Sequence, residues 1–106
     1  MKMTMNTEKL LKCLADPNRQ RIIKEIAGGK PCVNCIAQAT GMEQSLVSHH
    51  LAKLKCCCIV TPRQEGKNVF YSLVSPKIVA LLEMAAEAAS EISRACDEGA
   101  CEKGEC

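Results

Sequence analysis

The apolar residues of the first 60 positions recur at helical spacing, and this pattern constrains the fold more than any other feature of the chain. The helical stretches are bounded by residues that interrupt a helix, namely Pro17, Gly28-Gly29 and Gly41. Four helices are therefore expected in this part of the chain. They are a short one capped by Asn6 or Thr7, a second starting at Asp16-Pro17, a third over Asn34–Ala39 and a fourth over about Glu43–Cys57.

A change to a period of two follows Ile59-Val60 and predicts a β-hairpin. Residues 69–73 have the composition of a strand, and residues 64–68 are rich in turn-forming types. Pro62 restricts the first arm to an edge position, because proline donates no backbone hydrogen bond. The chain is therefore expected to be mainly α-helical with a small β-hairpin.

A last helix is expected after Ser75-Pro76, with apolar residues alternating by four and three positions in a heptad-like seam. The seam consists of Ile78, Leu82, Ala85, Ala89 and Ile92. A helix packed on its own domain would show the same spacing, but a domain this small gains core by pairing. We therefore expect a homodimer through terminal helices, one domain over residues 1–95 and an irregular or mobile cysteine-rich tail over residues 96–106.

Charge is distributed unevenly along the chain, although the net charge is only +2. Residues 1–76 carry 11 Lys and Arg against 5 Asp and Glu, whereas residues 77–106 carry 3 against 7. A basic front and an acidic rear suit a polyanionic partner on one side only.

The cellular compartment decides whether the nine cysteines are expected as free thiols or as disulfides. No run approaches the ~20 apolar residues of a membrane span, and the N-terminal residues lack the features of a signal peptide. We therefore expect a cytoplasmic protein without a membrane partner, whose thiols stay reduced. The odd number of cysteines also fits poorly with a disulfide framework.

Two helices joined by a tight turn at Gly41 match the helix-turn-helix arrangement, in which the second helix enters the major groove of DNA. Val47, Leu51 and Leu54 would anchor its inner face. The candidate DNA contacts lie on this helix and near the hairpin tip: Gln44, Ser45, Ser48, His49, His50, Lys53, Arg63 and Lys67. An ordinary helical pair with a solvated polar face would show the same pattern.

Residues 41–54, 59–60 and 63–73 closely resemble the ArsR/SmtB family of metal-sensing repressors, and residues 14–22 resemble that family's second-helix entry. The resemblance covers roughly residues 8–93. It implies a homodimeric winged helix-turn-helix that binds a palindromic operator without ligand and releases it when an inducer binds. It does not suggest an enzyme, and the Cys32-Val33-Asn34-Cys35 motif lacks the βαβ context of a thiol oxidoreductase.

Two residues depart from the family pattern. Glu43 stands where the family usually has serine, which is a better N-cap. Cys58 stands where the family usually has the glycine that ends the recognition helix, so a β-carbon occupies a position expected to need a positive φ.

One family site, a zinc-type site on the last helix, uses carboxylates and histidines. The last helix offers Glu83, Glu87 and Glu91 but no imidazole, because the chain's two histidines are His49 and His50. We therefore expect that zinc site to be absent or crippled.

Three cysteine sets remain as candidate ligands for a soft ion. Cys32 and Cys35 resemble a displaced version of a third-helix family site and would need a third thiol, for which Cys13 is the candidate. Cys13 or Cys35 could equally be a small buried hydrophobe.

The second set, Cys56, Cys57 and Cys58, is conspicuous, but its geometry is unfavourable for holding one ion. Neighbouring helical side chains point about 100° apart, so three successive thiols cannot face one ion while the helix persists. In a cadmium- and lead-sensing branch of the family, a cysteine matching Cys57 joins a second helix cysteine and one from the partner's tail. Lys53 occupies that second position here, so the resemblance is partial.

The third set, Cys96, Cys101 and Cys106, is favoured, because a segment jointed by Gly99 and Gly104 can fold three thiolates around one ion. Three thiolates without histidine suit trivalent arsenic, with cadmium, lead and mercury as alternatives. Some arsenic sensors of the family use tail cysteines comparably. A thiol-based redox or persulfide switch on the same fold is the alternative function.

Overall fold

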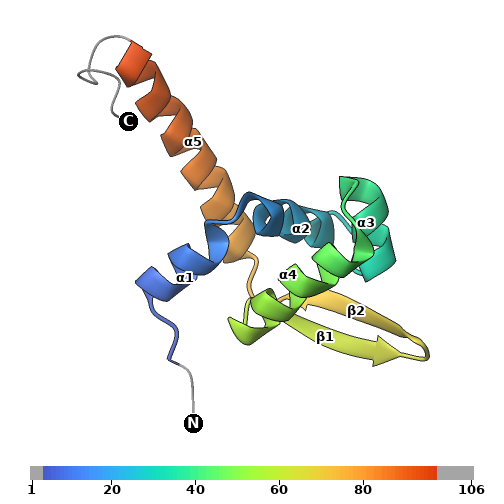
Figure 1. The fold of residues 1–106 in the computed structure, drawn as a ribbon. Coiled ribbons are helices and arrows are strands. Elements are labelled where there is room, and N and C mark those ends of the chain that lie inside the picture. Colours follow the sequence, from blue (N-terminus) through green and yellow to red (C-terminus); the bar gives the residue numbers. More distant parts are fainter. Residues whose placement is uncertain (1–3, 98–106) are drawn as a thin grey trace. The chain divides into compact units, whose positions relative to one another are not determined.

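The computed structural model describes residues 4–97, which form five helices and one β-hairpin (Figure 1). The elements are α1 (Thr7–Leu14), α2 (Pro17–Ala27), α3 (Val33–Thr40), α4 (Gln44–Cys56), β1 (Val60–Glu65), β2 (Asn68–Leu73) and α5 (Lys77–Asp97). The chain divides after Pro76 into two compact units, the second of which begins with α5. The expected fold class, mainly helical with one hairpin, is confirmed.

The first two helix starts follow from their capping residues. The Asn6 side chain accepts the N–H of Lys9 at 2.9 Å, so Asn6 rather than Thr7 caps α1. The Asp16 carboxylate accepts the N–H of Asn18 at 2.7 Å, and Pro17 occupies the first helical position of α2. Both observations confirm the sequence-based helix starts.

The core of the first unit is aliphatic, as a chain with one Phe, one Tyr and no Trp requires. Helices α2, α3 and α4 pack against one another, and α4 also packs against β1. The largest fully buried side chains are Ile22, Ile23, Ile36, Val47, Leu51, Leu54 and Val60. The three α4 members of this set are the stripe that the spacing predicts, so the opposite face of α4 is left for solvent or a partner.

The hairpin is antiparallel, with Val60 paired to Leu73 and Glu65 paired to Asn68. Its loop is shorter than the expected turn over residues 64–68, because both strands continue to residues flanking Gly66-Lys67. Gly66 has a φ of 62°, which suits glycine. The Tyr71 N–H also donates to the Pro31 carbonyl at 2.9 Å, so β2 is held against the segment that precedes α3.

The end of α4 adopts a Schellman motif. The N–H of Ile59 donates to the Leu54 carbonyl at 3.0 Å, and the N–H of Cys58 donates to the Lys55 carbonyl at 3.0 Å. Cys58 has a φ of 61° and is the one residue other than glycine with a positive φ in the described chain. The expectation that this cysteine occupies a position suited to glycine is confirmed.

Helix α5 extends to Asp97 and includes Cys96, so the expectation that the irregular tail begins at Cys96 is wrong at this residue. The helix continues there because no proline or glycine lies between Lys77 and Gly99. Residues 98–106, with Cys101 and Cys106, lie outside the described residues. No helix within residues 4–97 is long and apolar enough to cross a membrane.

Candidate nucleic-acid interface and thiol sites

The turn between α3 and α4 is fixed by local hydrogen bonds. Gly41 is left-handed, with a φ of 76°, and its N–H donates to the Ala37 carbonyl at 2.9 Å. The N–H of Met42 donates to the Thr40 hydroxyl at 3.3 Å, and Arg21 donates to the Thr40 carbonyl at 2.6 Å. These contacts connect α2, α3 and the start of α4, and so hold α4 in a fixed position relative to the other two helices.

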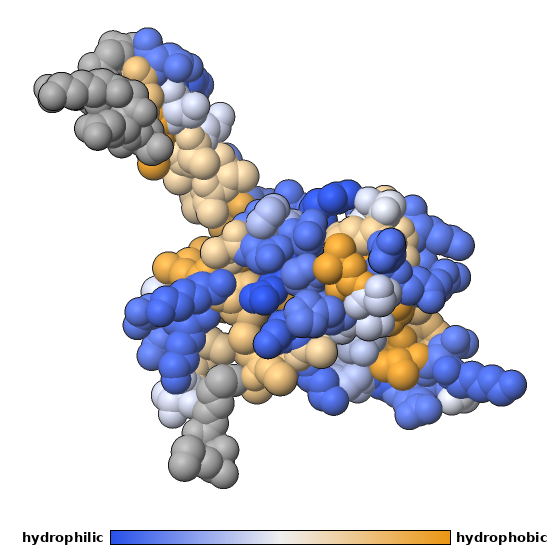
Figure 2. Space-filling model, viewed as in Figure 1, coloured by the Kyte–Doolittle hydropathy of each residue, from blue (hydrophilic) through white to orange (hydrophobic). Residues whose placement is uncertain are grey.

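The solvent face of α4 holds short, polar or basic side chains and is here named the reading face. It consists of Gln44, Ser45, Ser48, His49 and Lys53, all exposed. On the opposite side Val47, Leu51 and Leu54 have no exposed surface, so the face that can approach a groove is defined by burial. Figure 2 shows a surface on which hydrophilic side chains predominate and hydrophobic ones form separate patches.

His50 departs from the predicted contact set because it lies inside the protein. Its side chain is 6% exposed, and its Nδ1 has no hydrogen-bond partner among residues 4–97. Its ring meets the His49 ring edge-on, with centroids 5.6 Å apart. The helical period explains the difference: position 50 lies one turn after Val47 and one before Leu54, on the buried stripe. We therefore omit His50 from the proposed DNA contacts.

Asp16 lies near His50 and links the start of α2 to α4. Burial acts to raise the pKa of Asp16, but the N–H groups of Asn18 and Arg19 and the nearby His50 and Arg19 side chains outweigh it. The pKa of Asp16 is therefore held below its usual value of 3.8. This carboxylate stays ionised in neutral solution and keeps the cap of α2 intact.

The start of the reading face is joined to α3 by a side-chain hydrogen bond. The Gln44 amide donates to the Asn34 side-chain oxygen at 2.8 Å. Gln44 and Asn34 line a hollow together with Cys32 and Lys67, which brings the start of α3, the start of α4 and the hairpin tip to one place. No signal in the sequence marks Asn34 for this contact, because no helix-turn-helix pattern singles it out.

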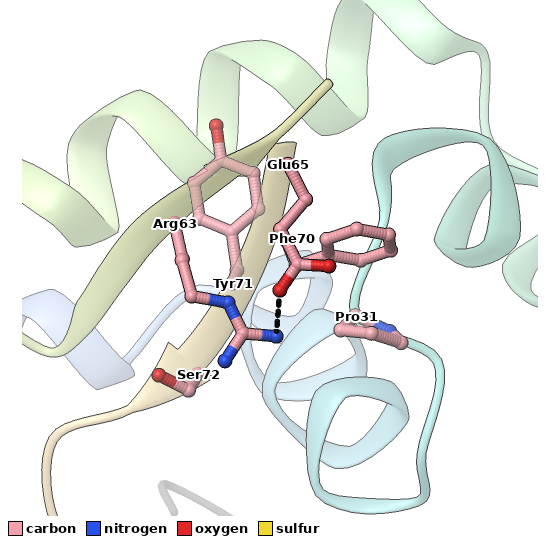
Figure 3. Close-up of a pocket in the computed structure, with 6 residues that line it drawn as sticks. All are labelled: Pro31, Arg63, Glu65, Phe70, Tyr71 and Ser72. Carbon is pink, nitrogen blue, oxygen red and sulfur yellow. Dashed lines mark ion pairs between the residues drawn. The ribbon is translucent and has the colours of Figure 1, made fainter. Parts of the chain in front are cut away.

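The two basic residues of the hairpin, Arg63 and Lys67, lie in different surroundings. Arg63 donates to Glu65 across 2.8 Å, and both side chains remain mostly exposed. Figure 3 shows this pair beside Tyr71 and Ser72, at a hollow that Pro31 and Phe70 complete. Lys67 lies exposed in the two-residue loop at the tip. Lys67 is therefore more available for a phosphate contact than Arg63, which is already paired with Glu65.

Cys32 and Cys35 are joined in a disulfide, which corrects the expectation that all thiols stay reduced. Cys32 caps α3, and the N–H of Cys35 approaches its sulfur at 3.1 Å. Residues three apart lie one helical turn apart on the same face. The position from which the Cys32 sulfur caps α3 is therefore also one from which it can reach the Cys35 sulfur. In this state the pair offers no thiolate to an ion.

Cys13 lies against Cys57 at the end of α4, with its side chain 3% exposed. The structure gives no support for the predicted grouping of Cys13 with Cys32 and Cys35, because those two are bonded to each other. Burial, followed by the Cys57 side chain, raises the pKa of Cys13 to about 12, although Arg19 acts in the opposite direction. The Arg19 guanidinium donates to the Cys13 carbonyl at 3.2 Å and lies 4.0 Å from its sulfur.

The consecutive cysteines Cys56, Cys57 and Cys58 differ in exposure, because α4 ends at Cys56 and the chain then turns through the left-handed Cys58. Cys56 and Cys58 are exposed, whereas Cys57 is half-buried beside Cys13. Within residues 4–97, no group of three or more His, Cys, Asp or Glu side chains is arranged to hold a metal ion. The pairing of Cys13 with Cys57 had no signal in the sequence, since 44 positions separate the two.

The α3–turn–α4 unit followed by the β1–β2 hairpin defines a winged helix-turn-helix, the fold of DNA-binding regulators. Residues 16–61 match the family described as "Bacterial regulatory protein, arsR family". The chain belongs to this family, whose members are transcriptional regulators and not enzymes.

Two relatives illustrate the similarity. The "HTH-type transcriptional regulator NmtR" of Mycobacterium tuberculosis is 37% identical over 75 residues, which is 71% of this chain and 62% of that protein. The match therefore spans less than two thirds of NmtR. The "Probable mercury resistance operon repressor" of Streptomyces lividans is 33% identical over 92 residues, or 86% of this chain and 73% of that protein.

The fold is also similar to solved structures. The homodimeric winged helix-turn-helix DNA-binding domain of Mb0332 from Mycobacterium bovis superposes with a TM-score of 0.69 and 31% identity. The match covers 79% of this chain and 78% of that chain. That domain is a homodimer.

Proposed function

We propose that this protein is a homodimeric transcriptional repressor that binds a palindromic operator and releases it when a thiophilic ion binds cysteine thiolates. The observation that carries the DNA part is the segregation of α4 into a fully buried stripe and an exposed reading face. A helix enters the major groove only if its outward side chains are short or hydrogen-bonding and its inward face is anchored. The hairpin supplies Lys67 and Arg63 for phosphate contacts.

The dimer part rests on α5 and on the homodimeric structural relative. Ala85, Ala89 and Ile92 of the predicted seam are exposed in the single chain, and Ile92 is 63% exposed. Ile78 and Leu82 are already buried in the single chain. Figure 2 shows weakly hydrophobic surface along α5, which the alanines of this helix account for. An exposed apolar strip of this kind suits a second copy of the same helix.

The sensing part rests on composition and on the mercury-operon relative. Thiolate ligands favour soft ions, and the chain has nine cysteines but two histidines, one of them buried. Within residues 4–97 no ligand group is preassembled, so the site requires residues 98–106, a partner chain or rearrangement. Cys96, Cys101 and Cys106 remain the favoured trio, with arsenite as the favoured ion and cadmium, lead and mercury as alternatives.

The test begins with selecting bound sequences from random duplex DNA and measuring affinity by fluorescence anisotropy. We expect a palindromic site with half-sites about one helical turn apart, and at least tenfold weaker binding when arsenite is added to reduced protein. Replacing Cys96, Cys101 and Cys106 together by serine should abolish the arsenite effect and leave binding without arsenite unchanged. An unchanged arsenite response in this variant would remove the tail from the proposal.

The Cys32–Cys35 disulfide supports a second candidate function, a thiol redox or persulfide switch. Cys32 lines the same hollow as Gln44 and Lys67, and Asn34 between the two cysteines accepts the Gln44 amide. Breaking the disulfide would therefore act directly beside the reading face. If reduction alone changes operator affinity in metal-free buffer, and Cys35→Ser removes the change, this candidate replaces ion sensing.

A further inference from the structure

Asn34 of α3 and Gln44 of α4 are joined across the helix-turn-helix by a hydrogen bond between their side chains. The Gln44 Nε2 donates to the Asn34 Oδ1 at 2.8 Å, although the two residues lie 10 positions apart in the chain. Both residues line one hollow with Lys67 of the hairpin tip. Gln44 is the first residue of α4, so this contact fixes the side chain with which the reading face begins.

Asn34 is attached to a well-supported stretch of backbone. It lies in the first turn of α3, between Cys32 and Cys35, which the disulfide joins. Cys32 also forms an antiparallel bridge to Phe70, next to the β2 residue that bonds the segment before α3. The Asn34 oxygen therefore offers Gln44 an acceptor from a fixed place.

The start of α4 receives little help from its own N-cap residue. Glu43 forms no side-chain cap hydrogen bond in the part of the chain that the structure describes, and Gln44 is exposed. The terminal amide of an exposed glutamine turns easily, because its last torsion has only broad and shallow preferences. The hydrogen bond to Asn34 selects one orientation before DNA binds, so less freedom is lost on binding.

The orientation that Asn34 selects fits the edge of one base. Recognition of adenine by two hydrogen bonds requires the glutamine oxygen to accept from N6 and one amide N–H to donate to N7. The Gln44 amide has two N–H groups, and Asn34 takes one of them. The oxygen and the second N–H remain for the base. Turning the amide over would set the Gln44 oxygen against the Asn34 oxygen, and two acceptors repel each other.

We propose that Asn34 is a positioning residue that sets the base preference of Gln44 at one base pair of each operator half-site, with adenine as the base read. This inference rests on the proposed function, because it needs α4 to lie in the major groove. Without Asn34 the Gln44 amide turns freely, and its N–H groups can donate to the O6 and N7 acceptors of guanine instead. Discrimination at that base pair then falls, whereas phosphate contacts, which carry no sequence information, stay in place.

The test selects bound sequences from random duplex DNA with the natural chain, Asn34→Ala, Gln44→Ala and the double variant. The base pair read by Gln44 is the one at which Gln44→Ala loses its preference. Anisotropy titrations with each of the four base pairs at that position should show that Asn34→Ala lowers the preference for adenine about fivefold. Preferences at other positions should stay unchanged. In the Gln44→Ala background, Asn34→Ala should change nothing further at that position, because its effect passes through Gln44.

Two further variants separate positioning from a merely structural role. Asn34→Asp keeps the acceptor oxygen and adds a negative charge, so it should weaken binding to all duplexes alike and retain the adenine preference. Gln38→Ala removes another exposed amide of α3, one that lines a different hollow, and should change neither quantity. Asn34→Ser shortens the side chain by one bond and repeats the measurement should the alanine variant fail to fold, as judged by circular dichroism.

Three results would overturn the proposal: an intact adenine preference in Asn34→Ala, an equal loss of affinity for all four base pairs in that variant, or no change of preference in Gln44→Ala. With any of these, sequence-specific binding by the natural chain would still support the DNA part of the proposed function. A natural chain that selects no sequence would remove both.

Discussion

The Leu54 carbonyl accepts the Ile59 N–H at 3.0 Å, across a left-handed Cys58 with a φ of 61°. A β-carbon in this conformation costs roughly 1 kcal/mol relative to glycine. Cys58→Gly should therefore raise the free energy of unfolding by about 0.5–1 kcal/mol, as measured by urea denaturation under reducing conditions. Cys56→Gly is the matched control, because position 56 is helical and glycine there should lower it by about 1 kcal/mol. Destabilisation by both changes would show that the Cys58 side chain is needed where it lies.

Asp16 predicts a dependence of stability on acid pH. Its folded pKa lies below its usual value of 3.8, so its contribution is complete above that value and is lost as the pH falls through the folded pKa. Asp16→Ala should lower the free energy of unfolding by about 1 kcal/mol at pH 7 and by less at pH 3. Asp16→Asn keeps a side-chain oxygen for the cap and should cost less than alanine. A pH-independent loss would show that the carboxylate charge plays no part.

Cys13 predicts a dependence of stability on alkaline pH. Its pKa is raised from 9.0 to about 12, so the unfolded chain ionises first and the contribution of the buried thiol is lost as the pH rises through this range. Under reducing conditions, the free energy of unfolding should fall by about 1 kcal/mol more for the natural chain than for Cys13→Ala between pH 8 and pH 10. Cys56→Ala, at an exposed thiol, is the control and should keep the slope of the natural chain. Equal slopes for all three proteins would contradict the burial argument.

Lys67 should contribute to DNA affinity without contributing to sequence preference. Lys67→Ala should weaken binding to selected and unselected duplexes alike and reduce the salt slope by about one for each protomer. Arg63→Ala should have a smaller effect, because Glu65 already neutralises Arg63. Lys24→Ala on α2 removes the same charge elsewhere and serves as the control. Anisotropy titrations at several salt concentrations measure all four proteins, and equal slopes for Lys67→Ala and Lys24→Ala would argue against contact at the hairpin tip.

Helix α5 allows a direct test of the dimer seam. Ala89→Glu places a charge in the predicted seam and should raise the dimer dissociation constant at least tenfold in sedimentation experiments. Ser90→Glu introduces the same charge at the neighbouring exposed position, outside the seam, and should have little effect. If both variants remain dimeric, the seam lies on another face of α5.

The amino-acid sequence by itself determined those features of this protein that depend on local interactions. Asp16-Pro17, Gly41 and the Val47–Leu51–Leu54 stripe act within a few residues, so they specified helix starts, the turn and the inner face of α4. The same logic anticipated the left-handed position at Cys58. The polar side chain of His50 predicts a DNA contact, but the helical period places it on the buried face of α4.

Tertiary structure decided what depends on contacts between distant segments. The contact of Cys13 with Cys57, and the hollow that Gln44 shares with Lys67, arise when helices and hairpin pack around an aliphatic core. No periodicity or spacing encodes such contacts, since packing, not sequence distance, brings these groups together. Nine cysteines alone suggested an affinity for soft ions. Within residues 4–97 the fold separates them into the Cys32–Cys35 disulfide, the buried Cys13, the half-buried Cys57 and Cys96, and the exposed Cys56 and Cys58.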